Sequence, residues 1–211
     1  MASVEKFGKH AITRRTMHLL EIDSLDDWPE ELDLKSKHFV LFLACDATDV
    51  LDEDLQGFAG RVIDQGMVYL STWGNDAERV HDVFDEVDAD RNPDSNADSV
   101  VLSEWHEDEP LPEALRFAVA TATPAHDYEK SCKATLCVSV GNPDWAEQIR
   151  GWLADPESLE KAVEEEDEGE EEEEDLDLDG DGDDEEEEGD EDEDEEDEEE
   201  DEDEDYDGDD D

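Results

Sequence analysis

Four apolar runs of this sequence end in polar or aromatic residues whose side chains could bind a ligand. The runs cover residues 38–45, 67–73, 99–105 and 134–140. The candidate ligand-binding residues at or just after their ends are Asp46, Asp49, Trp73, Trp105, His106 and Asn142. Because ligands of open α/β sheets lie beyond the carboxyl ends of the strands, we expect these side chains to converge on one edge. Carboxylates, one imidazole and aromatic walls would suit a divalent ion or a cationic group.

The same residues also have a purely structural explanation. Asp and Asn are favoured at helix starts whatever the function. Tryptophans can fill a sheet edge, and a histidine such as His106 can lie on the surface. We favour this structural interpretation over a binding site, and we assign no catalytic residue and no metal ligand.

Cys45 ends the first run, at a position where α/β enzymes often carry their nucleophile. Its neighbour Asp46 would raise the pKa of the thiol through like-charge repulsion, so we predict a buried structural cysteine instead. Cys132 and Cys137 are predicted core residues, and three cysteines without zinc-like pairing indicate reduced thiols in the cytosol.

The usual signatures of catalysis are missing from the sequence. It contains no G-x-S-x-G elbow, no G-x-x-x-x-G-K-[ST] loop, no G-x-G-x-x-G after an apolar run and no H-E-x-x-H pair. We therefore expect no cofactor, and we favour a non-enzymatic protein over an enzyme.

The elements that must position these residues alternate along the chain. Apolar residues recur at helical spacing in 51–63, 77–87, 111–122 and 145–153. Continuous apolar runs suit strands covered on both faces, and the alternation with helices predicts right-handed βαβ units. We predict an α/β fold, a three-layer sandwich with a mainly parallel sheet of about four strands in the flavodoxin-like order 2-1-3-4. A last helix is expected from Pro156 to about Glu168.

The C-terminal segment 164–211 is almost entirely acidic. Forty of its 48 residues are Asp or Glu, and no Lys or Arg follows Lys161. Carboxylates at this density repel one another, and the few apolar groups cannot offset chain entropy, so we predict a disordered polyanion. The expected division is a lead-in over 1–37 at the sheet edge, an α/β domain over 38–163 and a disordered polyacidic tail over 164–211. Within the lead-in, residues 10–22 could form a strand or a helix.

One stretch of the acidic segment fits a calcium-loop pattern. Asp177 begins the match and Glu188 ends it, but almost any position in this composition offers a carboxylate. We therefore expect diffuse association of divalent cations with the tail rather than a built metal site.

The rest of the chain is acidic too. The 35 acidic residues of 1–163, less all 14 Lys and Arg, leave 21 net negative charges there, out of 61 in the whole chain. Phosphates and anionic membranes would be repelled, so we predict no direct binding of nucleic acid or membrane. A basic protein is the expected partner.

With no signal peptide and no apolar stretch near ~20 residues, we expect a soluble cytoplasmic protein.

The order of four segments resembles that of a family of uncharacterised bacterial α/β domains. The segments are WPEELDLKSKHFVLFLACDATDV, VYLSTWGNDAERVHDVFDE, SVVLSEWHEDEPLPEALRFA and SVGNPDWAEQIR, which span about residues 28–153. The resemblance implies a single compact domain of bacterial source, here with an added acidic C-terminal tail. It supplies no catalytic residues, because no activity is established for that family.

Functions of different classes remain open. We favour a non-enzymatic interaction module whose acidic body and tail engage basic partners or cations, although the tail could also serve solubility alone. The alternative is a small α/β enzyme, or a ligand- or metal-binding domain, with its site at the strand carboxyl ends. Adaptation to high salt is a third explanation of the acidity. However, adaptation would spread acidic residues evenly rather than place 40 of 75 in one segment.

Overall fold

A computed structural model describes residues 3–174 of the protein, with side chains up to Glu166. Most of the acidic segment and the calcium-loop pattern at 177–188 lie outside the described residues. The predictions that this segment is disordered and binds divalent cations diffusely therefore concern residues that the structure does not describe.

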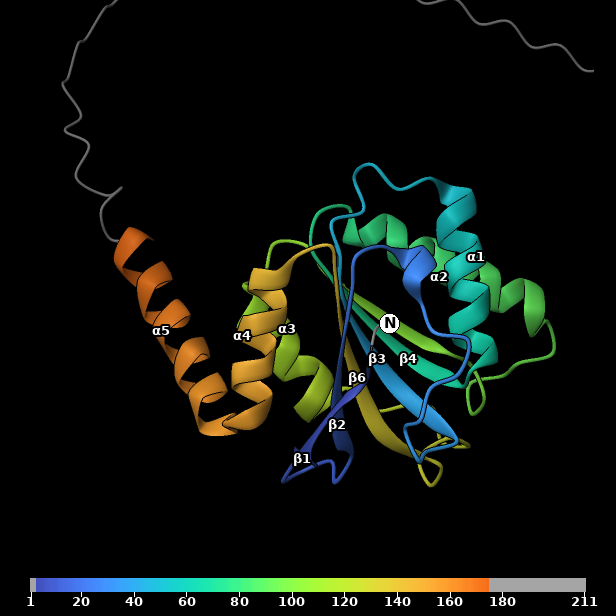
Figure 1. Ribbon diagram of the computed structural model, residues 1–211, viewed down its shortest axis with the longest axis horizontal. Coiled ribbons are helices and arrows are strands. Elements are labelled where there is room, and N and C mark those ends of the chain that lie inside the picture. The colour runs from blue at the N-terminus through green and yellow to red at the C-terminus, as the bar shows by residue number, and fades with distance from the viewer. Residues whose placement is uncertain (1–2, 175–211) are drawn as a thin grey trace, which may run out of the picture.

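Six strands form one sheet through the centre of the described part (Figure 1). They are β1 (Glu5–Lys9), β2 (Thr16–Ile22), β3 (His38–Ala44), β4 (Met67–Trp73), β5 (Leu102–His106) and β6 (Cys132–Val140). Their order across the sheet is β1-β2-β6-β3-β4-β5, and every neighbouring pair is parallel except β1 with β2. The predicted α/β class and mainly parallel sheet are confirmed, with two more strands than expected.

Helices cover both faces of this sheet (Figure 1). One face carries α1 (Asp52–Asp64), α2 (Ala77–Arg91) and the 3-10 turn η1 (Leu25–Asp27). The other carries α3 (Leu111–Arg116), the π-helix η2 (Phe117–Thr121), α4 (Pro143–Ala154) and α5 (Pro156–Glu174).

The central strand β3 explains why its sequence is apolar at nearly every position. Leu41 and Leu43 pack among the side chains of α1 and α2, while Phe42 and Ala44 pack among those of α3 and α4. All four are completely buried. A strand covered on both faces needs apolar side chains in succession rather than in alternation.

The predicted strand order is wrong. The four predicted strands are β3, β4, β5 and β6, and they lie in the order 4-1-2-3, because β6 lies on the opposite side of β3 from β4. There β6 also pairs with β2, from Thr16 opposite Ala134 to Ile22 opposite Val140. The lead-in 1–37 thus supplies two strands of the sheet, β1 and β2.

The third predicted helix is α-helical only as far as Arg116, where it continues as η2. Its end is held by the buried guanidinium of Arg15, which donates to the carbonyl oxygens of Ala118 and Ala122 at 3.0 and 2.7 Å. These donors satisfy carbonyls that the irregular helix end would otherwise leave unpaired.

The last helix, α5, begins at Pro156 as predicted but runs to Glu174 rather than to about Glu168. Residues 164–174 of the acidic segment are therefore helical. Within residues 3–174, no helix has both the length and the apolar character needed to cross a membrane.

The observed order places a topological switch point between β3 and β6. From β3 the chain winds outward through β4 to β5, and it then returns to β6 on the other side of β3. The connection after β3 leads to α1 on one face, and the connection after β6 leads to α4 on the other. Connections that leave in opposite directions open a crevice at the carboxyl ends of the two strands.

Candidate functional site

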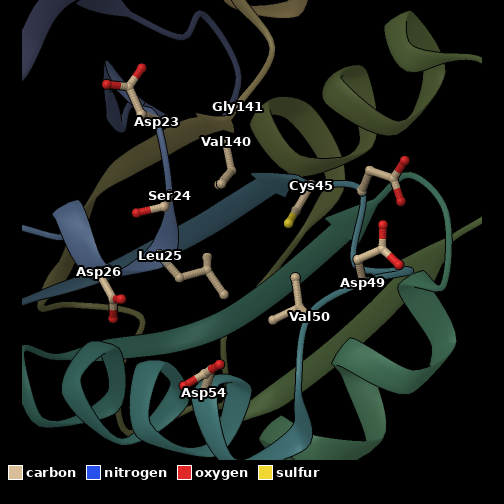
Figure 2. A pocket seen from close by; sticks show the side chains of 11 residues that line it. Asp23, Ser24, Leu25, Asp26, Cys45, Asp49, Val50, Asp54, Val140 and Gly141 are labelled. Atoms are coloured by element: carbon tan, nitrogen blue, oxygen red, sulfur yellow. The ribbon is translucent and has the colours of Figure 1, made fainter.

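A cleft of about 460 Å³ opens at this switch point, beside the carboxyl ends of β2, β3 and β6 (Figure 2). Its walls come from the residues that follow these strands and from the first turn of α1. The lining residues are Asp23, Ser24, Leu25, Asp26, Cys45, Asp46, Asp49, Val50, Asp54, Val140 and Gly141.

The cleft combines an acidic rim with an apolar floor. Five of its lining residues are aspartates, all exposed, and none is Lys, Arg or His. Figure 2 shows the side chains of Leu25, Cys45 and Val50 pointing into the space between the rim residues. Such a cleft attracts a positive charge and offers apolar contact to the carbon chain that carries it.

Asp46 is held in its ionised form by hydrogen bonds from two neighbouring loops. Its carboxylate accepts from the hydroxyl and the backbone N–H of Thr48, at 2.7 and 3.1 Å, and from the amide of Asn75 at 3.1 Å. These donors, the Thr48 hydroxyl first, lower the pKa of Asp46 below its ordinary value. The carboxylate therefore presents a fixed negative charge at neutral pH.

The loops after β3 and β4 position Asp46 by pairing with each other. The N–H of Cys45 donates to the carbonyl of Trp73 at 3.0 Å, and the N–H of Ala47 donates to that of Asn75 at 3.1 Å. Between them Gly74 has a φ of 118° and lies so close that a Cβ there would collide with the carbonyl oxygen of Cys45. Only glycine accommodates both conditions.

Two arginines stabilise the loops around the cleft without lining it. Arg79 donates to the carbonyl of Ala47 and pairs with Asp52 at 2.6 Å and Asp76 at 2.7 Å. Arg61 donates to the carbonyl of Leu25 at 3.1 Å. Both guanidinium groups are thus used in the frame and leave the carboxylates of the rim unneutralised.

Cys45 lies in the floor of the cleft as a protonated thiol. Burial, and then the charge of Asp46, raise its pKa to about 11. The predicted effect of Asp46 on this thiol is confirmed, although burial is the larger cause. A thiol of this pKa does not supply a thiolate nucleophile at neutral pH.

The structure brings only two of the six candidate residues, Asp46 and Asp49, into the cleft. Trp73 packs edge-on against Trp145 with ring centroids 5.0 Å apart, and its indole N–H donates to the carbonyl of Glu109 at 2.7 Å. Asn142 is the N-cap of α4, where its side chain accepts from two backbone N–H groups of the first turn. Trp73 therefore packs at the carboxyl end of its strand, and Asn142 caps a helix, as the structural interpretation predicts.

The other two candidates lie on β5, on opposite faces of the sheet. Trp105 packs against His81 of α2 in a tilted arrangement, with ring centroids 4.6 Å apart. His106 is buried rather than on the surface, where it contacts the ring of Phe117 and the carboxylate of Glu109, the latter at 2.8 Å. The order 2-1-3-4 would have placed β3 beside β5. In the observed order β4 separates them, so these residues do not join Asp46.

Several cleft residues were missed from the sequence. Asp23 and Asp26 follow β2, which lies in a stretch that the sequence leaves open between a strand and a helix. Asp54 lies in the first turn of α1. The available signal was the run Met17 to Ile22, which has only His18 and Glu21 as polar residues and is followed directly by Asp23.

The spacing of the rim carboxylates does not suit a metal ion. Among residues 3–166, no group of three or more His, Cys, Asp or Glu side chains is arranged to hold one. The described cleft thus presents several separate carboxylates rather than one cluster of ligands.

The fold and the cleft define an α/β domain protein with an acidic crevice at the switch point of a mainly parallel sheet. The chain belongs to a domain family of unknown function, DUF7684, which matches residues 15–156. The resemblance to an uncharacterised family is thus confirmed, and the match includes β2. No curated protein and no solved structure matches this chain.

Proposed function

We propose that this protein is a non-enzymatic interaction module that binds a cationic side chain of a basic partner in the cleft between β3 and β6. The observation that carries this proposal is a rim of five aspartates over an apolar floor, with no basic residue among the lining. An arginine or lysine could lay its apolar stem on Leu25 and Val50 while its charged head reaches the carboxylates.

The chemistry of the cleft supports binding over catalysis. Cys45 is a thiol with a pKa of about 11, and Ser24 donates its hydroxyl to Asp27 at 3.0 Å rather than to a general base. The buried imidazole of His106 is engaged with Glu109 and does not line the cleft. Nucleophilic catalysis needs a nucleophile within reach of a base, and the described lining residues offer no such pair.

The charge of the whole chain supports the same partner class. A net charge of −61 attracts a basic protein over long distances and speeds its encounter with the cleft, with a strong dependence on salt. We propose that the acidic segment 164–211 contributes mainly to this attraction. The three free cysteines fit a reducing compartment, so we also propose a cytoplasmic location.

A second candidate is a small-molecule site for an organic amine. It is favoured by the place of the cleft, because α/β proteins hold small ligands at the switch point of the sheet. In the first candidate the cation belongs to a side chain of a protein, and in the second it belongs to a free small molecule.

The proposal is tested by titrating the full chain with tri-arginine peptide in 150 mM salt while backbone amide shifts are followed by NMR. We expect saturable shifts centred on residues 23–26, 45–50 and 141. The variant Asp49→Asn should bind about two- to fivefold more weakly, the effect of one partly exposed charge pair. Asp94→Asn, an exposed change outside the cleft, is the matched control and should bind as the natural protein does.

A uniform, non-saturating response in which residues 23–26 and 45–50 do not stand out would contradict the proposal. Agmatine, which carries a guanidinium and an amine without a peptide, distinguishes the second candidate. Equal affinity for agmatine and for the peptide would assign the cleft to small amines.

A further inference from the structure

The strand β5 leaves one edge of the sheet open. It is the last strand in the order and pairs only with β4, from Tyr69 opposite Leu102 to Trp73 opposite His106. Within residues 3–174 no strand lies along its outer side. An uncovered edge presents unpaired backbone N–H and C=O groups and is a template for an added strand.

An aromatic side chain is exposed on this edge. Trp105 is 43% exposed, although its ring contacts that of His81. Tryptophan is among the residues that most often dominate the energy of a protein interface. Its ring face also attracts cations, Arg and Lys among them.

Acidic residues lie near Trp105 on two elements, β5 and α2. Glu104, the preceding residue of β5, is exposed on the opposite face of the sheet, and the strand runs on into Glu107 and Asp108. On α2, the carboxylates of Asp82 and Asp85 lie 3.0 and 3.7 Å from the imidazole of His81. No Lys or Arg occurs in residues 92–115. A basic segment would therefore be drawn to this edge, and an acidic one repelled.

We infer that the free edge of β5 binds an extended basic segment of a partner protein as an added strand, with an Arg or Lys of that segment over Trp105. This inference rests on the proposed function, because it assigns a second surface to the same class of partner. The backbone N–H and C=O groups of the edge would pair with the added strand. The carboxylates near Trp105 would attract a basic strand and repel an acidic one. A second copy of this chain is a poor occupant, because two chains of net charge −61 repel each other.

The test is hydrogen exchange on the full chain with a ten-residue peptide of alternating arginine and valine, in 150 mM salt. Side chains of an added strand alternate in direction, so such a peptide can place its arginines on one face. We expect slower exchange of alternate amides within residues 102–106. The variant Trp105→Ala should weaken peptide binding about two- to fivefold, as expected for an exposed cation–π contact. Trp105→Phe should retain part of the affinity.

Glu104→Lys is the charge variant, and Glu157→Lys on α5 is its matched control. Glu157 is exposed on α5 and lies outside β5, and the two substitutions change the net charge by the same amount. We expect Glu104→Lys to abolish the protection of residues 102–106 and Glu157→Lys to preserve it. Unchanged exchange in β5 at saturating peptide, or equal effects of the two Lys variants, would overturn the inference.

The same experiment keeps this inference apart from the proposed function. Protection of residues 45–50 without protection of 102–106 would overturn the edge inference and leave the cleft proposal standing. Protection of 102–106 that survives in Asp46→Asn/Asp49→Asn would support the edge alone. Concentration-dependent dimerisation of the free chain, measured by sedimentation and lost in Trp105→Ala, would assign the edge to self-association and overturn the inference.

Discussion

Cys45 and Asp46 are neighbours in the chain, yet their surroundings drive their pKa values in opposite directions. Burial keeps the sulfur of Cys45 out of water and its pKa at about 11. One residue later the chain emerges from the sheet, and Asp46 meets donors from Thr48 and Asn75 that stabilise its charge. The end of β3 thus marks the boundary between the core and the acidic rim.

All three thiols of the protein should be unreactive in the folded state. Burial raises the pKa of Cys137 to about 12 and also raises that of Cys132. For a pKa near 11, fewer than about 1 thiol in 1,000 is ionised at pH 7.5. We expect negligible reaction with Ellman's reagent in native protein and three thiols per chain after unfolding in guanidinium chloride. Rapid modification of Cys45 in native protein would contradict the account.

The carboxyl group of Asp46 should titrate below its ordinary pKa of 3.8. Because the folded-state pKa is lowered, the stability that this ionised group contributes is present above its unfolded pKa. It is lost as the pH falls through the lower, folded value. Thr48→Val removes the hydroxyl that contributes most to lowering this pKa. The pKa of Asp46, measured by ¹³C NMR, should therefore rise toward 3.8. An Asp46 pKa unmoved by Thr48→Val would contradict the assigned cause.

At the scale of elements, Asn142 is explained by helix capping. Its side chain accepts from the N–H groups of Asp144 and Trp145 at 3.1 and 3.2 Å. Asn142→Ala should lower the free energy of unfolding by about 1 kcal/mol, whereas Asn142→Asp should preserve most of it, because Asp caps equally well. Denaturant unfolding measures both. A loss of cation binding in Asn142→Ala without a loss of stability would instead make Asn142 a ligand-binding residue.

The helix α1 should be held mainly by Phe58. This fully buried ring packs edge-on against Trp28 at 5.2 Å and Phe84 at 5.9 Å, which joins α1 to the segment after η1 and to α2. Phe58→Ala should cost about 3–5 kcal/mol, from lost burial and the cavity that remains. Leu51→Ala, at a position 61% exposed, should change stability by less than about 0.5 kcal/mol in the same denaturant titration.

The elements that could be predicted from the sequence are those whose pattern is local. β3, β4 and β6 are continuous apolar runs, and α1, α2 and α4 carry clear apolar stripes. β2 is ambiguous in the sequence because His18 and Glu21 interrupt its apolar run. Its position in the sheet comes from pairing with residues more than 100 positions away in β6. The strand order depends on that pairing.

The candidate site was predicted only in part for the same reason. Asp46 and Asp49 follow a strand that the sequence predicts, so the sequence also predicts their place at the site. Asp23 and Asp26 follow β2 and could be joined to them only once β6 was known to lie between β2 and β3. Trp105 and His106 were grouped with Asp46 by an order that the structure does not have.

At the scale of the whole molecule, the acidic segment and the acidic cleft have separable effects. A chain that ends at Glu174 loses 30 of the 75 acidic residues but keeps every described element. We expect this chain to bind tri-arginine in the cleft with a smaller salt dependence, because fewer charges contribute to long-range attraction. Calorimetry from 50 to 300 mM salt measures the slope, with circular dichroism as the control for folding. Complete loss of saturable binding would place the function in residues 175–211 instead.

Calorimetry tests most directly whether the cleft between β3 and β6 binds a cation. The affinity of the full chain for tri-arginine in 150 mM salt is compared with that of the variant Asp46→Asn/Asp49→Asn. The control, Asp90→Asn/Asp94→Asn, removes the same charge from exposed residues outside the cleft. We expect the cleft variant to bind about tenfold more weakly and the control to bind as the natural protein does. Equal affinities for the two variants would contradict a cation site between β3 and β6.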